Sequence, residues 1–151
     1  MATKYPLVLS GTTIQELQSG DVLNGYVTPS STDTLTNKTL TNPTITNYTE
    51  TTFTANSSTA ITVDLANGTV QVITLTGNCT ITMPTATAGK SFTLLLKTGT
   101  GGFTVTWSAT TRWPAGTAPT LTSAATKLDK FVFTSDGTNW YGSNAGQNYS
   151  V

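Results

Sequence analysis

A repeat of five residues is the feature that most constrains this sequence. Its units read TLTNK at residues 34–38, TLTNP at 39–43 and TITNY at 44–48, and a degenerate fourth unit ends at Phe53. Side chains of a regular strand alternate between two faces, so this spacing would place Leu35 and Leu40 on opposite faces of a flat sheet. Three copies wrapped around one axis can instead return an apolar side chain to that axis at every repeat. The repeat therefore predicts an extended trimeric β stalk with Leu35, Leu40, Ile45, Tyr48 and Phe53 at the trimer interface.

The polar residues of the repeat fit the same interpretation. Asparagine tolerates the left-handed region at bends, Pro43 fixes one bend, and threonine hydroxyls can form hydrogen bonds between chains. The alternative is a disordered linker rich in threonine and asparagine. The fixed positions of Leu35, Leu40 and Ile45 favour the stalk, to which we assign residues 28–58.

Residues 1–27 read as two short strands set off by turns, because apolar runs at 5–9 and 12–17 are each followed closely by a Ser-Gly pair. The segment has too few apolar side chains for a core of its own, so we interpret it as a docking segment that is buried against another chain. Its apolar run 7–9 is far shorter than a signal-peptide core or a membrane span, which predicts a chain made soluble in the cytoplasm. The predicted docking residues are Tyr5, Leu7, Leu9, Ile14 and Leu17.

Residues 59–151 carry the densest strand signals. Apolar or alternating runs near 61–65, 70–75, 79–83, 91–97, 103–107, 130–134 and 140–142 are separated by Asn-Gly, Gly-Asn, Gly-rich and Asp-Gly turns. Threonine is β-branched and favours strands, so the polar composition is compatible with an ordered all-β protein. We predict a C-terminal antiparallel β-sandwich or jelly-roll-like knob, in which the turn 99–102 closes a hairpin. Its expected core contains Val63, Leu65, Val72, Ile73, Leu75, Ile81, Phe92, Leu94, Leu96, Val105, Phe131 and Phe133.

Several function classes are disfavoured by composition. The net charge is zero, charged residues make up 9%, and there is no basic stripe, so we expect no nucleic-acid partner. The sequence contains no histidine, the commonest general base and zinc ligand, and we expect no catalysis, no cofactor and no metal. Asp129 and Asp136 could be posed as the paired carboxylates of a glycan depolymerase, but we expect both to be exposed. Cys79 is the single cysteine and is expected to be a small buried side chain.

Two local motifs are candidates for binding sites. Residues 88–91 end like a phosphate-binding loop, but Pro84 occupies the first glycine position and Ser91 opens a strand pattern, so we reject a nucleotide site. Arg112 and Trp113 are the candidate for contact with a ligand or a neighbouring subunit, because an aromatic ring and a guanidinium can stack on a sugar or on protein. The more ordinary interpretation is that Trp113 folds back to cap an open end of the sandwich or packs against the next subunit.

Three stretches of the chain resemble proteins of bacteriophage particles. They are the opening YPLVL with IQEL at 14–17, the tract TLTNKTLTNP from Thr34 to Pro43, and the close FTSDGTNWY from Phe133 to Tyr141. The tract and the close are similar to segments of phage tail fibres, tail spikes and capsid decoration proteins. Fibres and spikes of that class are usually much longer, so the small chain is more similar to a capsid cement protein.

The resemblance implies a structural protein of the virion surface, made in the host cytoplasm. The first expectation is a homotrimeric capsid decoration protein that binds the major capsid protein and stabilises the head, with no membrane partner. The alternative is a short tail fibre or tail-spike-type adhesin that contacts other tail proteins and a host surface glycan.

Overall fold

The structure, a computed structural model, describes residues 7–10, 13–16, 34 and 39–151. The chain divides into two units, Met1–Thr44 and Ile45–Val151. In the first unit, β1 (Leu7–Ser10) pairs antiparallel with β2 (Thr13–Glu16), with Leu9 opposite Ile14. This pair confirms the prediction of two short N-terminal strands.

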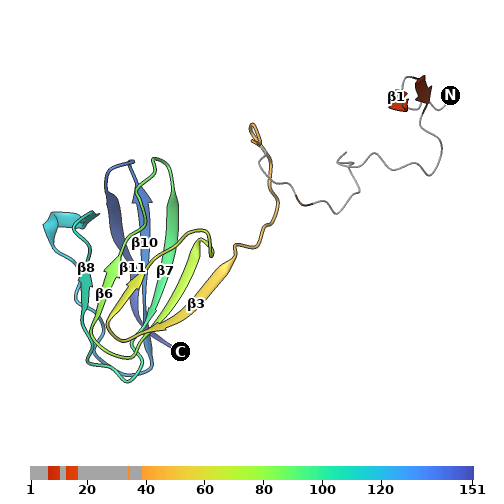
Figure 1. Cartoon of the computed structure of the whole chain (residues 1–151). Coiled ribbons are helices and arrows are strands. Elements are labelled where there is room, and N and C mark those ends of the chain that lie inside the picture. The colour runs from red at the N-terminus through yellow and green to blue at the C-terminus, as the bar shows by residue number, and fades with distance from the viewer. Residues whose placement is uncertain (1–6, 11–12, 17–33, 35–38) are drawn as a thin grey trace. The chain divides into compact units, whose positions relative to one another are not determined.

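The second unit consists of two β-sheets that enclose one core (Figure 1). A small sheet has the order β4-β6-β8, formed by β4 (Ala60–Thr62), β6 (Cys79–Thr82) and β8 (Val105–Trp107). A large sheet has the order β3-β5-β7-β10-β11-β9. Its strands are β3 (Thr52–Ser57), β5 (Val70–Leu75), β7 (Ser91–Lys97), β10 (Lys127–Ser135), β11 (Trp140–Ser150) and β9 (Thr111–Arg112).

The first six strands of this unit form three coils, in which the chain alternates between the two sheets. β3, β5 and β7 are mutually parallel in the large sheet, and β4, β6 and β8 are mutually parallel in the small sheet. Parallel neighbours need a long crossover connection, and here the strand in the opposite sheet supplies it. Thr54 therefore lies beside Val72, and Val72 beside Leu95, at successive levels of the coil.

The predicted antiparallel sandwich is thus wrong for this part of the chain, and the unit is a mixed-sheet sandwich. The turn at 99–102 does not close the predicted hairpin, because β7 and β8 lie in different sheets. The same holds for β5 and β6, which flank the turn signal at 77–78. A glycine-rich turn permits a reversal without dictating which strand becomes the neighbour. The prediction holds for β10 and β11, which form an antiparallel hairpin through the Asp136-Gly137 turn.

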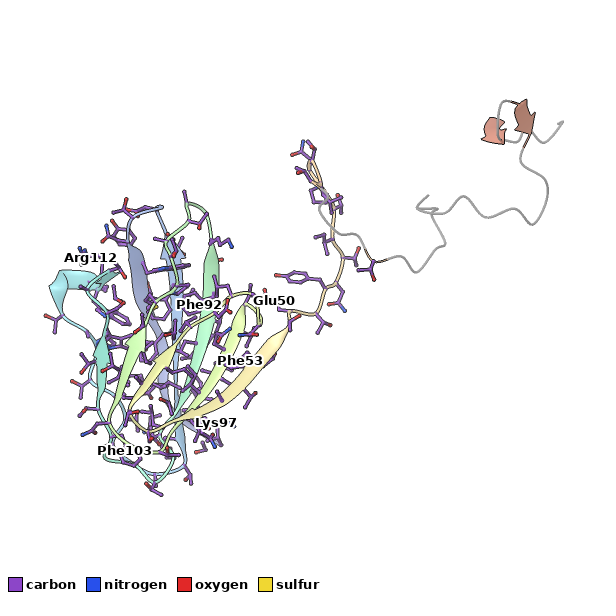
Figure 2. All side chains as sticks on the ribbon, viewed as in Figure 1. Glu50, Phe53, Phe92, Lys97, Phe103 and Arg112 are labelled. Atoms are coloured by element: carbon purple, nitrogen blue, oxygen red, sulfur yellow. The ribbon has the colours of Figure 1, made fainter. Side chains whose placement is uncertain are left out.

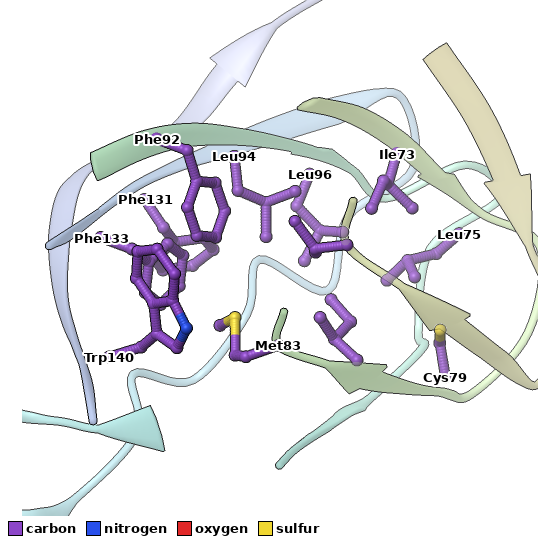
Figure 3. Close-up of a cluster of buried hydrophobic side chains, with 12 residues drawn as sticks. Ile73, Leu75, Cys79, Met83, Phe92, Leu94, Leu96, Phe131, Phe133 and Trp140 are labelled. Carbon is purple, nitrogen blue, oxygen red and sulfur yellow. The ribbon is translucent and has the colours of Figure 1, made fainter. Parts of the chain in front are cut away.

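The core lies between the sheets and contains twelve buried apolar side chains (Figure 3). Nine predicted core residues are among them, and Cys79 is buried as expected. Leu65 and Val105 are partly exposed and pack against this core. Val72 is not a core residue: its neighbours Gln71 and Ile73 point inward, so Val72 lies on the outward face of β5. Met83 and Trp140 were not predicted. The buried apolar residues are Val63, Ile73, Leu75, Cys79, Ile81, Met83, Phe92, Leu94, Leu96, Phe131, Phe133 and Trp140.

The folded knob begins before the predicted boundary at residue 59. β3 is an edge strand of the large sheet, and Thr52 pairs with Val70. Residues 52–57 therefore belong to the large sheet of the knob, and the predicted stalk boundary at residue 58 is wrong.

Candidate functional site

The described part of the pentad tract exposes its large apolar side chains. In the single chain, Leu40 is 59% exposed, Ile45 57% and Tyr48 68%. Side chains of this size are normally buried, and an exposed apolar series indicates contact with another surface. Leu35 lies outside the described residues, so its place at a trimer interface stays a prediction.

Phe53 has a different environment from the other predicted interface residues. It lies in β3 beside Gln71, which is fully buried, and it is itself half-buried on the core side of the sheet. Contact of Phe53 with a second copy stays a prediction.

The predicted docking residues are only partly within the described structure. Leu7 and Leu9 lie in β1 and Ile14 lies in β2, whereas Tyr5 and Leu17 lie outside the described residues. The two strands bring Leu7–Leu9 and Ile14 close in the backbone, although they are separated in sequence. Their role in docking stays a prediction.

Trp113 belongs to an aromatic cluster at the side of the sandwich. Its ring centroid lies 5.0 Å from that of Trp107, 5.7 Å from Phe131 and 5.5 Å from Phe133, all in edge-on arrangements. Gly142 makes room for it, since a β-carbon there would lie 2.7 Å from ring atoms of both Trp113 and Phe133. Trp113 therefore caps the sandwich, as the more ordinary interpretation stated.

Arg112 has a different environment from Trp113. It is exposed at the end of β9, and its guanidinium donates a hydrogen bond of 2.6 Å to the carbonyl of Ala109. Trp113 is half-buried against the core. Contact of either residue with a ligand or a neighbouring subunit stays a prediction.

A groove beside the aromatic cluster was not predicted. It has a volume of about 370 Å³ and lies between β8 and the loop that precedes β10. Its lining contains no charged side chain, so a neutral occupant is favoured. Alternation of apolar and polar residues along β8 could have indicated the wall formed by that strand. The opposite wall comes from the loop before β10, whose position the sequence does not reveal. The apolar lining residues are Phe103, Val105, Trp107, Ala118, Pro119 and Leu121.

Asp129 is fully buried in β10, which corrects the expectation that it is exposed. Its Oδ1 accepts hydrogen bonds from Thr122 Oγ1 at 2.7 Å and from the Asn148 N–H at 3.0 Å. Its Oδ2 accepts from the Thr122 N–H at 2.7 Å and from Gln147 Nε2 at 3.1 Å. Burial alone would raise the pKa of Asp129, but these four donors outweigh it and hold the pKa below its ordinary value.

Asp136 is exposed in the β10–β11 turn. It accepts hydrogen bonds from the N–H groups of Asn139 and Thr138, which lower its pKa, and from the hydroxyl of Tyr141, whose own pKa is raised. Asp129 and Asp136 are separated by seven residues of a nearly continuous strand, or about 23 Å at roughly 3.3 Å per residue. Glycosidase carboxyl pairs lie within about 10 Å, so this pair is unsuited to that chemistry.

Among the residues that the structure describes, no helix has the length and apolarity needed to cross a membrane. The same residues bring together no group of three or more histidine, cysteine, aspartate or glutamate side chains that could hold a metal ion.

Comparison with known proteins gives no relative: no family model, no curated protein and no solved structure matches this chain.

Proposed function

We propose that this chain is a non-enzymatic structural protein of a bacteriophage particle. In this proposal it is a homotrimeric capsid decoration protein that binds the major capsid protein and stabilises the head. The observation that carries the proposal is the exposed apolar series Leu40, Ile45 and Tyr48 of the pentad tract, in a chain whose knob is otherwise well packed.

Trimerisation accounts for that series. Leu40 and Ile45 recur at the pentad spacing, and an apolar side chain that recurs at that spacing can meet its two counterparts at a three-fold axis. Asn42 has a φ of 48°, the left-handed conformation that asparagine tolerates at a bend. Pro43 follows it directly, so the described repeat unit ends in a bend, as a wrapped stalk requires.

Attachment to the particle is assigned to the β1–β2 pair. A two-stranded pair is at best marginally stable alone in water, and a partner surface would stabilise it. Three such pairs on one trimer act as a unit, because binding of the first raises the effective concentration of the others. Weak individual contacts with neighbouring coat proteins can then give durable attachment that resists internal pressure.

The non-enzymatic part of the proposal has two supports. The sequence lacks histidine, and the two carboxylates that could have formed a glycosidase pair serve separate structural networks. The depolymerase hypothesis would require loss of polymer viscosity on incubation with the protein, and we expect no such loss.

A second candidate function is a short tail fibre or tail-spike-type adhesin. The groove lined by Phe103, Trp107 and Leu121 favours it, since an uncharged aromatic groove suits a neutral glycan. Binding to isolated host polysaccharide, lost on Leu121→Ser substitution, would select this candidate.

The trimer is tested by serine substitution in the pentads. The triple variant L35S/L40S/I45S should be monomeric by light scattering while retaining the tryptophan fluorescence of the folded knob. The matched control T36S/T41S/T46S places three serines in the same tract and should remain trimeric. A triple apolar variant that stays trimeric would exclude the stalk interface.

A further inference from the structure

The outward faces of the two sheets differ in chemistry. On the small sheet the outward side chains are all exposed and small or polar: Ala60, Thr62, Thr80, Thr82 and Thr106. On the large sheet a half-buried apolar group occupies the corresponding positions. Its members are Val70, Val72, Leu95, Leu128 and Val132, which we call the outer apolar face.

The strand register makes this face continuous. Val72 lies beside Leu95, and Thr93 lies between Val70 and Val132 in one row of the sheet. The small sheet belongs to the same coils and forms strands with threonine at its outward positions. Strand formation alone therefore does not require valine and leucine at the outward positions of the large sheet. Parallel strands with apolar residues on both faces are typical of sheets that are covered on both sides.

Charged side chains lie at opposite margins of the face. Glu50 lines a small hollow with Thr69, Ser91 and Thr93 at the end where the parallel strands begin. Lys97 lies at the other end of β7 (Figure 2). Four residues of strand separate Thr93 from Lys97, about 13 Å at roughly 3.3 Å per residue, which is too far for an ion pair within one chain.

Lys130 lies within the face and not at its basic margin. It projects from the same side of β10 between Leu128 and Val132, in one row with Val72 and Leu95. The acidic margin is connected to the pentad tract, because the hydroxyl of Tyr48 donates a hydrogen bond of 3.1 Å to Glu50. Thr69 Oγ1 also donates to Glu50 at 2.6 Å, which orients the carboxylate.

We propose that the outer apolar face binds a second copy of this chain head to tail, with Glu50 of one copy against Lys97 of the next. The inference rests on the homotrimer of the proposed function and adds a contact between knobs to the stalk. A second copy is the occupant because the face carries both members of a complementary charge pair at opposite margins. Apolar burial supplies affinity, and the charges select the orientation.

The experiment uses the full chain with a cysteine at each margin, T52C/T74C, and a short bis-maleimide cross-linker. Thr52 begins β3 at the acidic margin and Thr74 pairs with Lys97 at the basic margin, so Glu50 and Lys97 both stay in place. The native Cys79 is 3% exposed and should not react. Head-to-tail contact predicts covalent species up to the trimer on a denaturing gel. The single variants T52C and T74C should give much less, since each lacks the opposing thiol.

A matched pair of further substitutions tests the face itself. In the double-cysteine background, Leu95→Glu should reduce cross-linking by about tenfold or more, because it replaces the central apolar side chain of the face with a carboxylate that loses its hydration at the contact. Thr106→Glu, on the outward face of the small sheet, should leave cross-linking unchanged. Tryptophan fluorescence confirms that both variants fold.

The outcomes separate this inference from the proposed function. A protein that remains trimeric by light scattering but does not cross-link, or that cross-links equally with Leu95→Glu, overturns the outer apolar face and leaves the capsid role untouched. Specific cross-linking in a protein found only on phage tails supports the face and overturns the capsid role.

Discussion

Replacing Asp129 with asparagine should destabilise the knob by about 2 kcal/mol at neutral pH. Each carboxylate oxygen accepts one backbone N–H, from Thr122 on one side and Asn148 on the other. Whichever way the asparagine is turned, its NH₂ group faces one of these fixed donors and leaves it unsatisfied. A buried unsatisfied donor costs about 1–3 kcal/mol, and the loss of the charge weakens the remaining bonds.

The effect should depend on pH in a defined direction. Because the folded-state pKa of Asp129 is lowered, its contribution is fully present above the unfolded-state pKa, near 3.8. That contribution is lost as the pH falls from the unfolded-state pKa through the lower folded-state value. The difference in unfolding free energy between wild type and Asp129→Asn should therefore be constant from pH 5 to 7 and shrink below about pH 4.

The assay is urea unfolding followed by tryptophan fluorescence, at matched protein concentration because oligomers gain apparent stability with concentration. Asp136→Asn is the control: it changes the same residue type in the same hairpin, but at an exposed turn whose backbone donors the amide oxygen can still satisfy. It should cost less than about 1 kcal/mol. Equal stability of Asp129→Asn and wild type at pH 7 would refute the role assigned to the buried carboxylate.

Three other substitutions have defined expectations. Gly142→Ala should destabilise the knob by about 1–3 kcal/mol, because its new methyl group would overlap Trp113 and Phe133, and an unchanged urea midpoint would contradict this packing. Trp113→Ala should cost about 3 kcal/mol through loss of the aromatic cluster, measured in the same way. Arg112→Ala should change the free energy of unfolding by less than about 0.5 kcal/mol, because its hydrogen bond to the Ala109 carbonyl is exposed. A loss of stability well above this value would contradict a minor role for that hydrogen bond.

The sequence predicted the strands better than their partners. Alternation located the buried side of β7 and β10, because residues such as Leu94 and Phe131 recur at the two-residue period of a strand. It could not distinguish a hairpin from a coil, since both place a turn after a strand and the neighbour is chosen by contacts distant in sequence. Val72 was misassigned for a related reason. Both faces of β5 carry β-branched apolar residues, Val72 outward and Ile73 inward, and Gln71 occupies a core position that composition would give to an apolar residue.

The candidate site was predictable only where a pattern was periodic. The pentad spacing identified Leu40 and Ile45, which are exposed in the single chain. The groove beside Trp107 arises from the loop between β9 and β10, which has no periodic signal. Asp129, by contrast, shares the inward side of β10 with Phe131 and Phe133, so alternation could have indicated its burial. Its hydrogen-bond donors, which come from that loop and from β11, have no such signal. Loops are positioned by a few specific hydrogen bonds, and those bonds become visible only in three dimensions.

The location of the protein on intact particles tests the central claim most directly. Cryo-electron microscopy of purified phage, with and without the gene product, should show trimeric density over the head lattice in contact with the major capsid protein. Density confined to the tail would contradict the capsid decoration role and select the adhesin instead, and absence from purified particles would contradict both.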